Sequence, residues 1–205
     1  MQKNDSISEA QKIQDAQKLK DFIEVAENMI LRYVADKFSG KISIDYLKEF
    51  IENTNIGIDY NCDSHLGGYY APLNDGAIFI NSEKIRVKSI KDYFQVIGTI
   101  IHELQHKFSA EIAHKDFENK QLDEGFSDLF ADECINHFLE NYLGEIIKLG
   151  WSEEDVEQIY ELQEIRGIHT SAYQRRIRIY KDSNGSYKAE NRKTLRSRIR
   201  IYFWR

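Results

Sequence analysis

Apolar residues recur at every third or fourth position over residues 5–38, in a segment otherwise rich in Lys, Gln and Glu. An α-helix turns every 3.6 residues, so this spacing predicts one long or two short helices with a single apolar face. Ser39 and Gly40 end the pattern, and residues 46–51 predict another short helix that stops near Asn53. The chain is therefore expected to begin with a helical region.

Strand-like segments follow between residues 56 and 80. Residues 56–60 alternate between apolar and polar positions, and residues 67–71 and 77–80 are two further strand candidates, with an Asn-Asp-Gly turn between them. Pro72, the only proline, has no backbone N–H and suits an edge strand. We expect a small sheet whose exposed edge can pair with an extended peptide.

Helical spacing returns after this sheet. Apolar residues form helical stripes over residues 89–114 and 121–147. Ser152 is a candidate cap for a third helix over residues 151–166. Helices are thus expected to dominate the middle of the chain.

The C-terminal segment differs from the rest in both pattern and charge. Arg-Ile-Arg-Ile-Tyr occurs at 176–180 and again at 198–202 with period-two alternation, which predicts a basic β-hairpin around Asn184-Gly185. The net charge of −6 divides into +9 for residues 171–205 and −15 for the remainder. Such asymmetry favours either an anionic partner such as nucleic acid, or docking of the tail on its own acidic body.

Length and composition fit one globular domain with appendages. The 205 residues are 41% hydrophobic, which supplies a core. No stretch approaches the ~18 apolar residues of a membrane span, and the N-terminus lacks a secretory pattern, so we expect a cytoplasmic protein with no membrane partner. Cys62 and Cys134 are single and far apart, which excludes a disulfide framework and a paired-thiolate zinc site.

The sequence His102-Glu103-Leu104-Gln105-His106 carries the clearest chemical signal. Two histidines four positions apart on a helix project from one face, so both imidazoles can reach one Zn²⁺ ion. The intervening Glu103 is placed beside that metal, where a carboxylate can take a proton from a zinc-activated water. This pattern predicts zinc-dependent hydrolysis with Glu103 as the general base.

A third zinc ligand is expected from the following helix. Glu124, Asp128 and Asp132 fall along one helical face, and carboxylates stacked in this way repel each other unless a cation is near. We predict Glu124 as the ligand and Asp128 as the acceptor of an N–H from a ligating histidine. Asp123 and Asp128 are the rival ligands. A third histidine ligand fits less well, because Ser109 and Ile112 stand where the short HExxHxxGxxH pattern has Gly and His.

These motifs resemble those of known zinc peptidases. HELQH followed by Glu124-Gly-Phe-Ser-Asp128 is similar to the HExxH and ExxxD pattern of the gluzincins, including thermolysin-like peptidases. The segments before and after HELQH, within residues 56–135, also resemble the small ImmA/IrrE-like metallopeptidases, although Ser127 stands where that pattern usually has Ala. The resemblance implies a zincin-like fold and peptidase activity. It also suggests an oxyanion-stabilising role for His169, with Tyr173 as the alternative donor, while His65 and His137 are given no role.

The fold class predicted is α+β and zincin-like, with N-terminal helices, a small mixed sheet, the HExxH helix and a helix that carries the third ligand. We divide the chain into a helical region (1–40), a catalytic domain (41–170) and a basic extension (171–205). The predicted function is that of a zinc metallopeptidase acting on a protein or peptide substrate. Two alternatives stay open: a regulatory or nucleic-acid-binding protein with an inert or sensory zinc domain, and an interaction domain with a structural zinc site.

Overall fold

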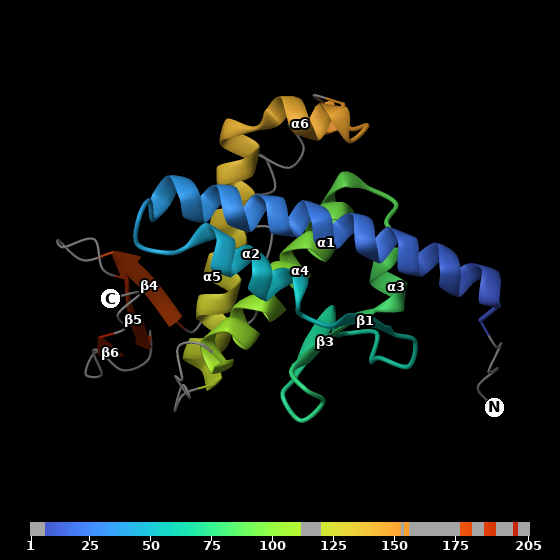
Figure 1. Cartoon of the computed structure of the whole chain (residues 1–205), viewed down its shortest axis with the longest axis horizontal. Helices are drawn as coiled ribbons and strands as arrows, with labels where there is room; N and C mark the ends of the chain where they lie inside the picture. The colour runs from blue at the N-terminus through green and yellow to red at the C-terminus, as the bar shows by residue number, and fades with distance from the viewer. Residues whose placement is uncertain are drawn as a thin grey trace.

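A long N-terminal helix lies across the two long helices at the centre of the molecule (Figure 1). The structure is a computed structural model. It describes residues 7–111, 120–152, 154–155, 177–181, 187–191 and 199–200. In these residues the chain is mixed α+β, mostly helical, with a small three-stranded mixed sheet. The α+β class is therefore confirmed.

The N-terminal segment forms one continuous helix, α1 (Glu9–Lys37). The Ser8 hydroxyl caps it by accepting the N–H of Gln11 at 3.2 Å. Its apolar face packs against both α4 and α5, described below, and buries Phe22, Met29 and Tyr33. The shorter helix α2 (Ile44–Glu52) follows, capped in the same way by Ser43. Both predicted helices are confirmed.

The three predicted strands form one sheet. β1 (Ile56–Asp59) runs parallel to β3 (Ala77–Asn81), and β2 (Gly68–Ala71) runs antiparallel to β3. The strand order is β1-β3-β2, so β3 is central and β2 lies at an edge. β3 is also the most buried strand. A short helix that the sequence pattern did not predict, α3 (Ser82–Ile85), follows it directly.

Two long helices form the centre of the molecule. α4 (Ile90–Glu111) and α5 (Lys120–Asn141) pack against each other, and α1 contacts both. Apolar residues from all three share one core with β3, which includes Met29, Ile78 and Ile101. Among the helices in the described residues, none is long and apolar enough to cross a membrane.

The predicted helix over residues 121–147 is interrupted at Tyr142. This residue has φ −131° and ψ 30°, outside the helical region, so α5 ends before it and α6 (Leu143–Lys148) begins after it. Its side chain makes tertiary contacts with α1: the hydroxyl donates to Asp36 at 3.1 Å, and the Arg32 guanidinium lies 4.1 Å from its ring centre. We attribute the break to these contacts, with Gly144 reducing the preference for a continuous helix.

The basic extension contains a second sheet of β4 (Ile177–Lys181), β5 (Tyr187–Asn191) and β6 (Ile199–Arg200). β4 pairs antiparallel with β5, and β6 pairs with the other edge of β5. The antiparallel pair β4–β5 flanks Asn184-Gly185, as the hairpin prediction had it, and the second Arg-Ile-Arg-Ile-Tyr copy pairs through β6 with β5 and not with the first copy. A short connection between β4 and β5 costs less loop-closure entropy than one that joins the two copies. The three domain boundaries stay predictions.

Candidate metal centre

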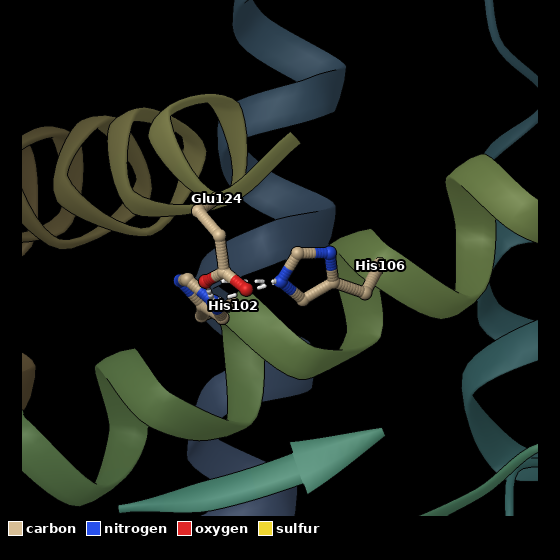
Figure 2. A group of neighbouring side chains, drawn as sticks. All are labelled: His102, His106 and Glu124. Carbon is tan, nitrogen blue, oxygen red and sulfur yellow. Dashed lines mark hydrogen bonds and ion pairs between the residues drawn. The ribbon is translucent and has the colours of Figure 1, made fainter. Parts of the chain in front are cut away.

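The site lies where α4 crosses α5. His102 and His106 are one helical turn apart on α4, on the side that faces α5. The flanking Ile100, Ile101 and Leu104 are buried in the core and hold this turn of the helix in place. α5 begins nine residues beyond the last residue of α4 and brings Glu124 to the same point from its first turns. Two packed helices therefore supply the three side chains (Figure 2).

Three donor atoms converge at this crossing. The Nε2 atoms of His102 and His106 are 2.9 Å apart. Glu124 Oε2 lies 3.3 Å from Nε2 of His102 and 3.6 Å from Nε2 of His106. One ligand atom from each residue lies within 4.8 Å of the other two, so a single metal ion can contact all three. The structure thus brings the three predicted ligands together.

The Nδ1 atom of each imidazole, on the opposite side of the ring from the convergent Nε2 atoms, contacts a carboxylate on α5. Nδ1 of His102 lies 2.9 Å from Oδ1 of Asp128, and Nδ1 of His106 lies 2.8 Å from Oδ2 of Asp123. Ser127, which is fully buried, places its hydroxyl 3.3 Å from the same nitrogen of His106. The Asp128 contact is the one that the sequence predicted.

This arrangement of charges fits a cation. A carboxylate beside Nδ1 favours the tautomer with the proton on that atom, which leaves Nε2 of both rings as a lone-pair acceptor. The two Nε2 lone pairs then point toward each other and toward the Glu124 carboxylate. Three acceptors in one buried place repel unless a metal ion or added protons lie between them. The donor set of two imidazoles and one carboxylate therefore fits a divalent metal.

The pKa values show what the carboxylates do to the imidazoles. Burial lowers the pKa of His102, but its contacts with Asp128 and Glu124 outweigh this and raise it to about 9. Burial opposes charging of His106 too, and its contacts with Asp123 and Glu124 raise its pKa to about 10. Contacts with His102 and His106 hold the pKa of Glu124 well below its usual range. The carboxylates thus stabilise positive charge at this point.

Glu103 lies beside the three ligands but faces a different element. Its side chain is buried, and burial raises its pKa above the usual value, while the charges of His102 and His106 act in the opposite direction. The backbone N–H of Tyr70, on strand β2, donates a hydrogen bond to its carboxylate. Glu103 is thus a buried carboxyl group with a raised pKa directly beside the three convergent donors.

Two residues that contact His106 were not predicted in that role. Asp123 was weighed only as a rival ligand, and Ser127 was noted only as a departure from a family pattern. Their spacing of four places both on one face of α5, which is the signal that identifies them as a pair. His169, the predicted oxyanion stabiliser, and its alternative Tyr173 lie outside the described residues. Those assignments stay predictions.

No protein-family profile, curated protein or solved structure gives a significant match to this chain. The geometry of His102, His106 and Glu124 is therefore what indicates a function for this chain.

Proposed function

We propose that this chain is a zinc-dependent metallopeptidase with a zincin-like catalytic domain. The observation that carries the proposal is the convergence of Nε2 of His102, Nε2 of His106 and Oε2 of Glu124, with Glu103 beside them. The spacing of these residues, HExxH and then a glutamate on the next helix, supports the gluzincin resemblance. Because catalytic zinc sites use three protein ligands and keep one open position, this donor set suits catalysis.

Zinc suits the donor set better than the other common divalent ions. Imidazole ligands favour transition metals over Mg²⁺ and Ca²⁺, which prefer oxygen. The carboxylates behind both rings orient the imidazoles and increase their basicity, as in many zinc sites. His102, His106 and Glu124 would therefore hold the ion, with Asp128, Asp123 and Ser127 fixing the rings.

The proposed reaction is hydrolysis of a peptide bond without a covalent intermediate. When bound, zinc supplies Lewis acidity, which lowers the pKa of a nearby water to about 7 and polarises the substrate carbonyl. Glu103 takes a proton from that water on its carboxylate and then donates it to the nitrogen of the leaving amine. Its raised pKa suits both steps, because the same group must accept and release a proton.

A protein or peptide substrate is supported by strand β2. β2 lies at the edge of its sheet and contacts α4, the helix that carries Glu103. An extended peptide can pair with such an edge through main-chain hydrogen bonds. Since the Tyr70 N–H reaches Glu103 from this strand, a peptide that pairs with β2 is brought close to the general base.

The test is the variant Glu103→Gln. We expect it to bind zinc with unchanged stoichiometry while cleavage of an unstructured protein such as casein falls about 100- to 10,000-fold, since the general base is lost. Glu140→Gln, the same chemical change at an exposed position on α5, is the matched control and should cleave at the wild-type rate. If Glu103→Gln retained zinc and still cleaved like the wild type, the proposed mechanism would be refuted.

A further inference from the structure

Strand β2 approaches the metal-bearing helix through two consecutive glycines. A Cβ atom added at Gly67 would lie 2.8 Å from Oγ1 and 3.2 Å from Cγ2 of Thr99, on α4. At Gly68 it would lie 2.7 Å from the backbone oxygen of Phe79 and 3.1 Å from Cγ2 of Thr99. Carbon contacts shorter than about 3.5 Å are repulsive, so neither position has room for a side chain.

The backbone conformation does not explain these glycines. Neither residue has a φ in the left-handed region, where glycine is favoured over other residues. Gly67 is restricted by its packing on Thr99 of α4, and Gly68 is restricted both by Thr99 and by Phe79 and Ile80 of the neighbouring strand β3. Glycine at both positions lets β2 lie against Thr99 while it stays paired with β3.

This close packing controls the distance between β2 and Glu103. Thr99 precedes Glu103 by one helical turn, and Tyr70 follows Gly67 by three residues, so the strand runs alongside the helix in the same direction. Further along, Tyr70 Oη lies 3.3 Å from Glu111 on the same helix. With β2 held at Thr99 and at Glu111, the Tyr70 N–H between them points at the Glu103 carboxylate.

We propose that Gly67, Gly68 and the Tyr70 backbone N–H are positioning elements for Glu103: the two glycines seat β2 on Thr99, and the amide then fixes the orientation of the carboxylate. A side chain at position 67 would lift the start of the strand from α4. The hydrogen bond to Glu103 would lengthen or break, while His102, His106 and Glu124 would keep their packing between α4 and α5. This inference rests on the proposed function only for its catalytic consequence.

The geometric part is tested by the amide resonance of Tyr70 in ¹H–¹⁵N NMR spectra of the full chain. Glu103→Ala removes the acceptor and should shift the Tyr70 amide proton upfield. Gly67→Ala should shift it in the same direction, since the strand moves away. The double variant Gly67→Ala/Thr99→Ala removes both atoms that clash and should return the resonance to its position in Thr99→Ala alone. If Gly67→Ala left the resonance unmoved, the inference would be wrong.

A second pair of variants tests the amide itself. Tyr70→Pro removes the N–H, and proline is tolerated at an edge strand whose N–H does not pair with the sheet. Tyr70→Ala is its reference, because both lose the aromatic side chain and only the proline variant loses the donor. In cleavage assays Tyr70→Pro should show a kcat at least about tenfold below that of Tyr70→Ala, with similar KM and zinc content, since small misplacements of a catalytic group are costly.

The two proposals fail in different ways. If wild-type protein and Glu103→Gln are equally inactive, the peptidase proposal fails, and the NMR comparison still decides whether the glycines position Glu103. If the wild type is active but Gly67→Ala keeps the wild-type kcat and Tyr70 amide resonance, and Tyr70→Pro has the kcat of Tyr70→Ala, the positioning inference fails and the peptidase proposal stands. A loss of zinc in Gly67→Ala would also contradict the inference, because the ligands should not move.

Discussion

Two buried histidine clusters join helices in this molecule, and they can be compared atom by atom. His102 links α4 to α5 through Asp128 at 2.9 Å, and His137 links α5 to α1 through Asp36 at 2.8 Å. Both imidazoles are buried, and both have an aromatic or imidazole ring beside them: His106 for the first and Tyr33 for the second. By burial and by carboxylate contact alone, the two clusters are alike.

The clusters differ in the contacts of the imidazole nitrogen that does not face the aspartate. In His137 the Nδ1 atom lies 3.2 Å from the side-chain amide nitrogen of Asn141, a hydrogen-bond donor, and Nε2 faces Asp36. The Nδ1 lone pair of His137 thus has a hydrogen-bond donor from the protein, and Nε2 can donate to Asp36. In the neutral rings of His102 and His106 the Nε2 atoms are acceptors that face each other and the Glu124 carboxylate, so protons or a metal ion must lie between them. The comparison teaches that a metal site is recognised by acceptors that converge, and not by buried histidine beside carboxylate.

Removal of one imidazole is expected to give the largest difference in zinc affinity between the two clusters. Structural zinc sites with four protein ligands bind the ion with about 10–16 kcal/mol, which is on the order of 3 kcal/mol for each ligand. His102→Ala removes one ligand and should therefore weaken zinc binding at least about 100-fold. His137→Ala should leave zinc affinity unchanged. Competition with a chromogenic chelator measures both, and equal losses in the two variants would contradict the distinction.

The carboxylates behind the rings should have smaller but measurable effects. Asp128→Asn removes the charge that orients His102, and such changes cost about 10- to 100-fold in metal affinity. Asp36→Asn is the same substitution beside His137 and is expected to have no effect on metal affinity. Competition with the same chelator measures zinc affinity in both variants. A normal affinity in Asp128→Asn would show that Asp128 does not orient His102.

The pH dependence of the metal site follows from the raised pKa values of its histidines. His102 and His106, at about 9 and 10 against an ordinary 6.5, hold protons at neutral pH that a metal must displace. Zinc affinity should therefore rise with pH up to about 9, by up to about tenfold per pH unit for each proton displaced. The wild-type affinity is measured between pH 6 and 9, and a flat profile would contradict the proton competition.

The free energy of unfolding of the metal-free protein should fall as the pH rises, whereas zinc affinity increases over the same range. A folded-state pKa raised above the unfolded value contributes stability that is fully present below pH 6.5 and is lost as the pH rises toward 9 to 10. Metal-free protein should thus become easier to unfold over this window. Zinc-loaded protein should not, because the ion replaces the protons. Thermal unfolding of both forms checks the sign.

The smallest expected effect is a loss of folding stability, without a change in zinc binding, when His137 is replaced. His137→Ala removes the link between α5 and α1 and a ring packed against Tyr33 and Tyr142, which should cost about 1–3 kcal/mol in the free energy of unfolding. For a chain of this size, the Tm should fall by roughly 2–4 °C per kcal/mol. Zinc content and cleavage should remain normal, and loss of either would mean that the His137 cluster also supports the metal centre.

Local pattern was enough to predict most of the elements and the central residues of the site. The three strands of the first sheet and the helices of the metal site have clear periodicity, and the i, i+4 spacing of His102 and His106 determines that they share a face. Contacts between elements were harder to predict. The break at Tyr142 comes from its contacts with α1, and the carboxylate that holds His106 was indistinguishable by sequence from a ligand. The expectations of a cytoplasmic location and a nucleic-acid partner stay predictions.

Helix α1 contributes no ligand, yet it touches both helices that do. Its 29 residues extend over roughly 43 Å at 1.5 Å per residue, so one rigid rod spans the junction of α4 and α5. At its N-terminal end the buried Asp15 pairs with Arg86 beside α3. The two helices that carry His102, His106 and Glu124 thus share a third helix as a common support, and a substitution in α1 far from these side chains is expected to change how they converge.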